Sequence, residues 1–129
     1  MIVDTSALIA IAKHEPEAPR FQLLLKQHEV AMSAATLVEA EVVARMQLRQ
    51  GGLAAVRGLI RAADTRIVPV DEVQASIGSD AYEKYGRGSG SPARLNYGDC
   101  FSYALAIAHD EPLLCKGADF IHTDVRIAE

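Results

Sequence analysis

Four acidic residues stand at positions where a carboxylate could do chemistry. Each begins or ends an expected secondary-structure element beside apolar residues, where a charge needs a partner or a role. They are Asp4 in MIVDTSAL, Glu39 in SAATLVEAEVV, Asp99 in NYGDCFSYALA and Asp119 in LLCKGADF. If the fold brings them together, their mutual repulsion predicts a bound cation, and oxygen ligands favour Mg²⁺, with Mn²⁺ as a substitute.

A metal ion held by carboxylates suits phosphoryl chemistry, because it can activate a water, orient a phosphate and stabilise the charge of the leaving oxygen. Ser6 lies two residues after Asp4, at an expected helix start, and could orient a carboxylate or a water. A mechanism with Ser6 as nucleophile is not indicated, since no local motif positions a histidine.

The same carboxylates also have purely structural interpretations. Asp4 and Asp99 could be helix N-caps, a common use of aspartate. Glu39 could be a solvated helix residue like Glu41, which points about 200° away around the helix, so at most one of the two faces a site. Spacing alone leaves both interpretations open.

The elements that must position these residues alternate between strand-like and helix-like segments. This pattern predicts an α/β fold with a short parallel sheet of about four to five strands, flanked by helices in three layers. Strands are expected at 1–4, 30–32, 66–68, 112–115 and 125–127. Helices are expected at 6–13, 17–28, after Ser33 or Thr36 to Leu48, at 53–64, from Asp71 to 85, and at 97–110. The carboxyl ends of parallel strands meet at one sheet edge, where the carboxylates could converge.

The segment 86–94, GRGSGSPAR, is expected to be a mobile loop. Its G-x-G-x-G pattern could suggest a phosphate-binding turn, but the segment follows a helix where a nucleotide-binding turn would follow a strand.

Composition limits the possible classes of protein. At 129 residues, half of them apolar and without repeats, the chain is expected to form one domain over residues 1–129. No apolar run reaches the roughly 18 residues of a membrane span, and the N-terminus lacks signal-peptide features, so a cytoplasmic protein starting at Met1 is expected. The net charge of −4 argues against binding of nucleic acid through global positive charge, but it does not exclude a nuclease.

The two cysteines, Cys100 and Cys115, lie in apolar segments and are expected to be buried hydrophobic residues. With the scattered histidines they lack the close ligand pair of a zinc site.

The sequence resembles the PIN-domain ribonucleases, in particular the VapC-type toxins of bacterial and archaeal toxin–antitoxin pairs. The matching stretches are MIVDTSAL, SAATLVEAEVVAR, LNYGDCFSYALA and LLCKGADFIHTD, which span nearly the whole chain in the family's order and spacing. The resemblance implies a PIN-like fold and Mg²⁺- or Mn²⁺-dependent endoribonuclease activity. It also implies, in many cases, a homodimer, and a cognate VapB-type antitoxin that inserts a segment into the active-site groove.

The resemblance implies that the residues of this chain that match the family's motifs form its acidic site. The carboxylates that would hold the metal and act in catalysis are Asp4, Glu39, Asp99 and Asp119, with Ser6 as a supporting polar residue. In this hypothesis one or two metal ions bind the scissile phosphate, and a metal-activated water attacks in line to leave a 3′-hydroxyl and a 5′-phosphate.

The fourth acidic position departs from the family's pattern. Many relatives carry a threonine and an Asp or Asn where this chain has Cys115 and Gly117. Its role is therefore assigned to Asp119, with Asp124 in reserve, although both could be turn residues.

Four arginines are candidates for holding RNA beyond the acidic centre. Arg45 and Arg49 are expected on one helix face, and Arg87 and Arg94 flank the flexible loop. Each could equally be solvated surface. A groove of this kind is expected to take a shaped or single-stranded RNA.

Two other functions stay open at this point. The chain could be an inactive PIN-like module that only binds RNA or a partner, or a different metal-dependent phosphohydrolase that acts on DNA or a small phosphoester. Loss of metal binding with intact partner binding would favour the first, and a comparison of RNA, DNA and p-nitrophenyl phosphates would identify the second.

Overall fold

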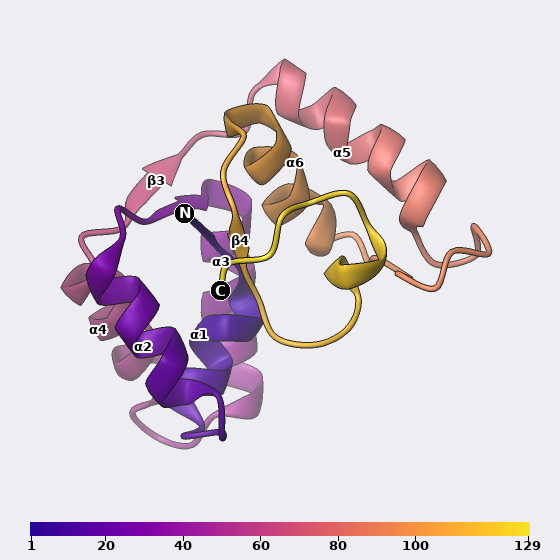
Figure 1. Ribbon diagram of the computed structural model, residues 1–129. Coiled ribbons are helices and arrows are strands. Elements are labelled where there is room, and N and C mark those ends of the chain that lie inside the picture. Colours follow the sequence, from indigo (N-terminus) through magenta and orange to yellow (C-terminus); the bar gives the residue numbers. More distant parts are fainter.

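Four short parallel strands form the centre of the computed structural model, which describes residues 1–129 (Figure 1). They are β1 (Ile2–Val3), β2 (Ala31–Ser33), β3 (Arg66–Val68) and β4 (Leu113–Leu114). The strands pair in parallel in the order β3-β2-β1-β4. The expected short parallel sheet is confirmed.

The fifth strand expected at 125–127 is reduced to a single bridge between Leu113 and Ile127. The Leu113 N–H donates to the Arg126 carbonyl at 2.8 Å, and the Ala128 N–H donates to the Leu113 carbonyl at 2.9 Å. The segment meets the sheet edge at one residue of β4, which is too little contact to extend a ladder.

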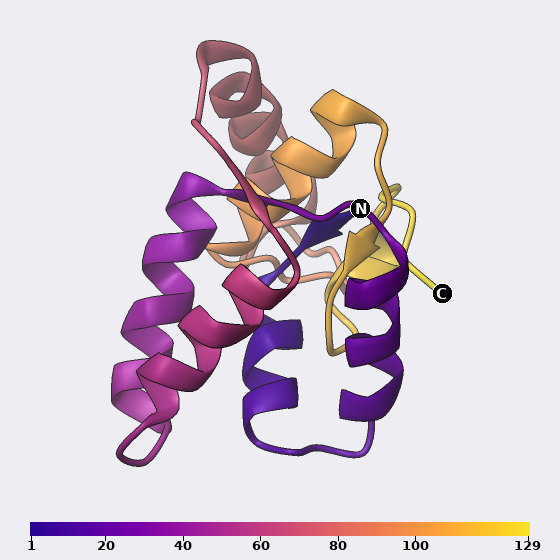
Figure 2. The same cartoon turned by 90° about the vertical axis from the view of Figure 1, so that its left-hand side faces the viewer.

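Six helices cover the two faces of the sheet. They are α1 (Thr5–Ala12), α2 (Ala18–Gln27), α3 (Ala34–Gln47), α4 (Gly52–Ala62), α5 (Glu72–Tyr85) and α6 (Asp99–His109), with a short 3₁₀ helix η1 (Phe120–His122) near the end. Helices α1 to α4 lie on one side and α5 and α6 on the other (Figures 1 and 2). The expected three-layer arrangement is confirmed.

The core follows the pleat of the strands, in which neighbouring residues point to opposite faces. Val3 and Leu114 pack into the cluster under α1 to α4. Ile2 and Leu113 pack into the cluster under α5 and α6. Strands β1 and β4 are therefore buried on both faces, which explains their unbroken apolar sequence.

Polar side chains start the helices as the sequence indicates. Asp4 caps α1, and Asp71 caps α5 through the Gln74 N–H at 2.8 Å. Of the two residues considered for α3, Ser33 is the N-cap, accepting from the Ala35 N–H at 3.3 Å. These caps fix where each helix leaves the sheet edge.

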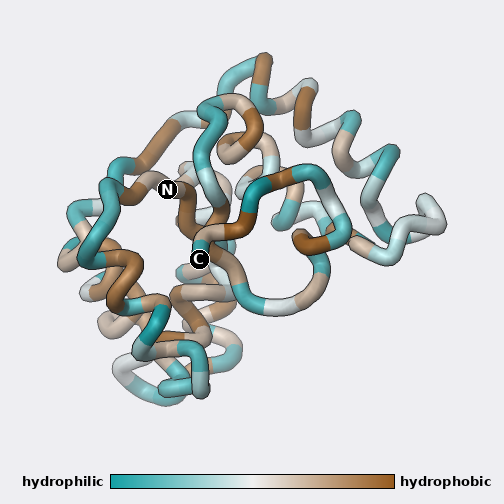
Figure 3. Tube along the Cα trace, viewed as in Figure 1, coloured by the Kyte–Doolittle hydropathy of each residue, from teal (hydrophilic) through white to brown (hydrophobic).

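The loop after α5 lies at the right of the view in Figure 3, where most of it is pale, between hydrophilic and hydrophobic. Its two ends are attached to the body of the protein, because Gly86 bridges to Leu95 and the Ala93 and Leu95 side chains are fully buried. Gly88 and Gly90 both have φ of +87°, a conformation that requires glycine. The mobility of the loop stays a prediction.

Cys100 and Cys115 are buried free thiols, as expected. None of the helices combines the length and the apolar character needed to cross a membrane.

Candidate active site

The four predicted carboxylates line one hollow at the carboxyl edge of the sheet. Its volume is about 510 Å³. Its polar lining includes Asp4, Ser6, Glu39, Asn96, Asp99, Lys116 and Asp119. These residues come from the end of β1 with the start of α1, from the loop after β4, from the first turns of α3 and from the start of α6 with the residues before it, as the geometry of a parallel sheet predicts.

Asp4 is held by three hydrogen bonds and is only 4% exposed. Its Oδ2 accepts from the Ser6 N–H at 2.9 Å and from the Ser6 hydroxyl at 2.6 Å. Its Oδ1 accepts from the Ser102 hydroxyl at 2.6 Å. The Lys116 N–H in turn donates to Ser6 Oγ at 2.9 Å. Ser6 therefore orients the Asp4 carboxylate, the position expected of a supporting residue.

Ser102 is a site residue that the sequence analysis missed. It is fully buried, and its Oγ lies 3.1 Å from Thr36 Oγ1. Because an ionised Asp4 can only accept, Ser102 donates to Asp4 and Thr36 donates to Ser102. The available signal was spacing: Ser102 follows Asp99 by three residues, on the same face of an otherwise apolar helix.

Asp99 is both a helix-capping residue and a hollow-lining carboxylate. Its Oδ2 accepts from the Asn96 N–H at 2.7 Å, and its own N–H donates to Asn96 Oδ1 at 2.9 Å, a reciprocal capping box. Its Oδ1 has no hydrogen-bond partner in the chain. Asn96, which also lines the hollow, is a second residue that the sequence analysis missed.

Burial raises the pKa of Asp99 to about 7, against the hydrogen bond from Asn96. Repulsion from Asp4, Glu39 and Asp119 contributes to this rise. An ionised Asp99 in this hollow therefore needs a nearby positive charge.

Glu39, and not Glu41, faces the acidic hollow. Glu39 is half-buried, and burial followed by repulsion from Asp4 raises its pKa, with the Thr5 hydroxyl opposing the rise. Glu41 instead accepts from Arg57 at 2.8 Å and from Arg45 at 3.4 Å. The choice between these two residues that spacing left open is settled by the packing of α3.

Asp119 and Asp124 are placed differently. Asp119 is exposed, lines the hollow and directly precedes η1. Asp124 lies outside the hollow, where its Oδ1 accepts from the Tyr103 hydroxyl at 2.5 Å. This hydrogen bond lowers the pKa of Asp124. Burial, followed by the same hydrogen bond, raises the pKa of Tyr103.

The carboxylates share a hollow without forming a closed metal cage. No three His, Cys, Asp or Glu side chains lie close enough to enclose an ion. Mg²⁺ is commonly held by one or two carboxylates together with waters and substrate phosphates, and does not require such a cage. The oxygen-only donor set and the free Asp99 Oδ1 fit a hard divalent cation of this kind.

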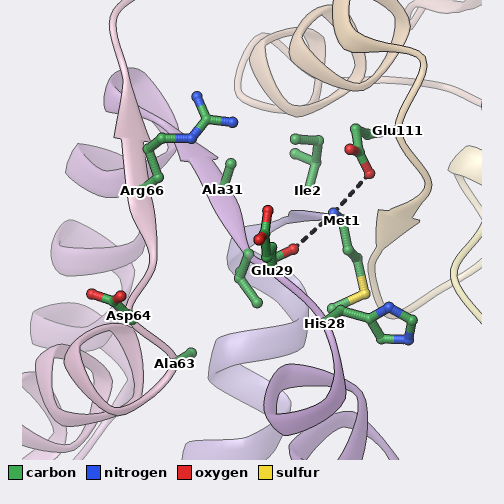
Figure 4. A pocket seen from close by; sticks show the side chains of 10 residues that line it. Met1, Ile2, His28, Glu29, Ala31, Ala63, Asp64, Arg66 and Glu111 are labelled. Atoms are coloured by element: carbon green, nitrogen blue, oxygen red, sulfur yellow. Dashed lines mark hydrogen bonds and ion pairs between the residues drawn. The ribbon is translucent and has the colours of Figure 1, made fainter.

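A second hollow of about 370 Å³ lies at the opposite edge of the sheet (Figure 4). There the Met1 ammonium donates to the Glu29 carbonyl at 2.9 Å and to Glu111 Oε2 at 2.8 Å. The bond to the N-terminus lowers the pKa of Glu111. The Met1 ammonium is paired with Glu111, and the hollow lies at the amino ends of the strands, so we do not assign the chemistry to it.

The expectation that Arg45 and Arg49 share a helix face is wrong. Helix α3 ends at Gln47, and Leu48 is extended with φ of −100° and ψ of 151°. Arg49 therefore lies in the loop before α4. Arg45 stays on the helix and pairs with Glu41, away from the acidic hollow.

Arg49 lines a further hollow of about 640 Å³ together with Lys13 and His14. Gln47 lines both this basic hollow and the acidic one, so the two are adjacent. Arg87 and Arg94 are exposed and line neither.

A four-stranded parallel sheet between helices, with carboxylates gathered at its carboxyl edge, defines a PIN-like α/β protein. The family model described as the PIN domain matches residues 1–126. The chain therefore belongs to the PIN domain family.

Several proteins are similar to this chain over nearly its whole length. Ribonuclease VapC28 of Mycobacterium tuberculosis is 47% identical over 129 residues, covering 99% of this chain and 97% of that protein. The structure of M. tuberculosis VapC20, described as a sarcin-ricin loop cleaving toxin, has a TM-score of 0.73 at 17% identity, covering 96% and 95% of the two chains. A toxin–antitoxin complex from Klebsiella pneumoniae has a TM-score of 0.70 at 19% identity, covering 98% and 95%. The two structures support the fold, and the first relative supports the family.

Proposed function

We propose that this protein is a metal-dependent endoribonuclease toxin of the VapC type, which cleaves RNA phosphodiester bonds. The observation that carries the proposal is the convergence of Asp4, Glu39, Asp99 and Asp119 on one hollow. The high identity to a VapC ribonuclease supports RNA as the substrate class.

In this proposal Asp4 and Asp99 are the main ligands of a Mg²⁺ or Mn²⁺ ion, and Glu39 and Asp119 complete the acidic site. When bound, the cation supplies activation of a water and stabilisation of the charge that develops on the phosphate and leaving oxygens. The products are a 3′-hydroxyl and a 5′-phosphate.

The chain itself contributes orientation and charge. The hydroxyls of Ser6 and Ser102 donate to the Asp4 carboxylate and orient it, and the Asn96 N–H donates to Asp99. These bonds fix the ligands before substrate arrives, which reduces the reorganisation needed for catalysis. Burial and repulsion raise the pKa of Asp99 to about 7, so a large share of Asp99 is protonated at neutral pH when no cation balances the acidic cluster.

The basic hollow next to the acidic one is the proposed path for the RNA strand. Lys13 donates to the neutral Gln47 amide at 3.0 Å, and Arg49 forms no ion pair, so both cations are available to phosphates. Arg45, neutralised by Glu41, is a weaker candidate. Arg87 and Arg94 are proposed only for contacts further from the cut.

We further propose a cognate VapB-type antitoxin, a homodimeric state and a cytoplasmic location. The likeness to a toxin–antitoxin complex supports the antitoxin. A short neighbouring gene for such a protein, and the molar mass of the purified chain by light scattering, would test the two assembly proposals.

The experiment that tests the function is cleavage of total RNA by the purified protein with Mg²⁺, with Mn²⁺ and with EDTA. We expect discrete cuts that need metal, and a loss of at least about 100-fold in Asp4→Asn and Asp99→Asn, because each removes a charged ligand. Mapping the cut ends identifies the substrate.

The matched control is Asp80→Asn, an exposed aspartate on α5 with no ion pair, which should cut like the wild type. Circular dichroism checks that every variant is folded. If the wild type cuts no RNA with any metal, or both site variants cut normally, the endoribonuclease proposal fails. Activity on DNA or p-nitrophenyl phosphates alone would favour a different phosphohydrolase.

A further inference from the structure

The backbone of Gly98 lies directly against the carboxylate of Glu39. A Cβ atom added at Gly98 would stand 1.7 Å from Glu39 Oε2 and 2.7 Å from Glu39 Cδ. Non-bonded carbon atoms prefer separations of about 3.5–4.0 Å. The Glu39 carboxylate therefore occupies the space that any side chain at position 98 would need.

The requirement at Gly98 is one of space and not of backbone conformation. Gly98 has φ of −63° and ψ of −40°, ordinary right-handed helical values that alanine adopts freely. Gly88 and Gly90 differ, because their φ of +87° disfavours any other residue. An alanine at 98 therefore strains no backbone dihedral. Its Cβ meets mainly Glu39, with Asn96 Oδ1 as a milder contact at 3.3 Å.

Glu39 depends on this space because nothing else in the chain holds its carboxylate firmly. The Asp4 carboxylate accepts three hydrogen bonds and that of Asp99 accepts one, whereas Glu39 has only the Thr5 hydroxyl nearby, which donates to the Thr36 carbonyl at 3.5 Å. Gly98 directly precedes Asp99 at the start of α6, so the close approach brings Glu39 of α3 beside Asp99.

A clash at this point can be relieved at low energetic cost in one way. Glu39 is a long, flexible side chain, whereas α3 and α6 pack against each other and against the sheet. A side chain at 98 would therefore push the Glu39 carboxylate aside and leave the helices in place.

We propose that Gly98 is a positioning residue: its missing side chain leaves the room in which the Glu39 carboxylate stands beside Asp4 and Asp99, and any side chain there displaces Glu39 from the acidic site. The proposal rests on the proposed function in that Glu39 serves a metal-dependent cleavage site.

The test is a double-mutant cycle of Gly98→Ala and Glu39→Gln, read by kcat/KM for RNA cleavage and by Mn²⁺ affinity without RNA. Each single variant should lose about 10–100-fold in both quantities, the range for disturbed support of a metal ligand. The double variant should fall no lower than Glu39→Gln alone, whereas independent effects would multiply.

The matched control is Gly58→Ala in α4, where an added Cβ meets nothing within 4 Å, and it should behave like the wild type. If Gly98→Ala lowers the melting temperature, Gly98→Ala in a Glu39→Ala background removes the clash and should restore it. A failure of this restoration overturns the proposal.

Wild-type cleavage and Mn²⁺ binding in Gly98→Ala would also overturn it, as would multiplicative losses in the double variant. If the wild type binds Mn²⁺ but cuts no RNA, the proposed function fails while the Mn²⁺ arm still decides the role of Gly98. A wild type that binds no Mn²⁺ overturns both.

Discussion

Asp4 and Asp99 each cap a helix and also line the acidic hollow. Asp4 caps α1 through the Ser6 N–H, and Asp99 shares a capping box with Asn96. Both also line the acidic hollow. The hydrogen bonds that begin the helices are the ones that orient the carboxylates, so the structural and functional interpretations of these residues do not compete.

At the residue scale we predict that Asp99→Asn stabilises the metal-free protein. Asp99 has its pKa raised from an ordinary value of 3.8 to about 7, so the folded state binds more protons than the unfolded state between these values. Its charge therefore costs stability that accumulates as the pH rises from about 4 to about 7 and is then constant. The neutral amide avoids this cost and retains an oxygen to accept from Asn96.

The measurement is the free energy of unfolding in EDTA at several pH values, compared between wild type and Asp99→Asn. The variant should gain roughly 1–3 kcal/mol at pH 7.5, since one pKa unit corresponds to about 1.4 kcal/mol and part of the burial remains. The gain should shrink toward pH 4. A gain that is independent of pH, or a destabilised variant, would contradict the assignment, and Asp80→Asn should show no such trend.

At the scale of elements, a chain of hydroxyl groups joins α3, α6 and the end of β1. Thr36 donates to Ser102, Ser102 to Asp4, Ser6 to Asp4, and the Lys116 N–H to Ser6. Each link connects a different element at the carboxyl edge of the sheet. The hydrogen bonds that orient the acidic site thus also connect the two helical layers.

Ser102→Ala should lower both the stability of the protein and the affinity of the acidic site for Mn²⁺. Removal of the hydroxyl leaves the buried Thr36 without its acceptor and Asp4 with one donor fewer, which costs about 1–3 kcal/mol of unfolding free energy. Mn²⁺ affinity should fall about 10-fold or more, because Asp4 is less firmly oriented.

Chemical denaturation and Mn²⁺ titration check these two effects. Ser79→Ala on the exposed side of α5 is the matched control, and it should change stability by no more than about 0.5 kcal/mol. Normal stability and Mn²⁺ affinity in Ser102→Ala would show that the hydroxyl chain has no energetic role.

At the scale of the whole molecule, the distribution of charge matters more than the net charge of −4. Most cations near the site are neutralised: Arg57 pairs with Glu41, and Lys116 pairs with Glu15 and Glu17. Lys13 and Arg49, in the basic hollow, have no carboxylate partner. A chain that is acidic overall can therefore still present local positive charge to a phosphate backbone.

We predict that the double variant Lys13→Ala and Arg49→Ala raises the KM for RNA several-fold with little change in kcat. Loss of one or two phosphate contacts should also reduce the salt dependence of RNA binding by about one unit of slope for each contact. The measurement is binding and cleavage at several salt concentrations. Arg57→Ala is the control, and an equal effect there would mean that charge in general, and not this hollow, holds the RNA.

Much of this protein was determined by short stretches of sequence. The caps Asp4, Ser33 and Asp71, the apolar strands and the glycines after α3 act within a few residues, so their effects are visible without a fold. The last segment shows the limit: 125–127 looks like a strand, but only its contact with β4 decides that it forms a single bridge.

The tertiary structure alone decided which residues make up the site. It placed Glu39 and not Glu41 in the hollow, and Asp119 and not Asp124, and it added Ser102 to Asp4 across 98 positions of sequence. It also showed why position 98 is a glycine. Such choices depend on packing between elements that are distant in the chain. A rotation of one helix, or a different path of one loop, would bring a neighbouring residue into the site instead, and local propensities do not contain that information.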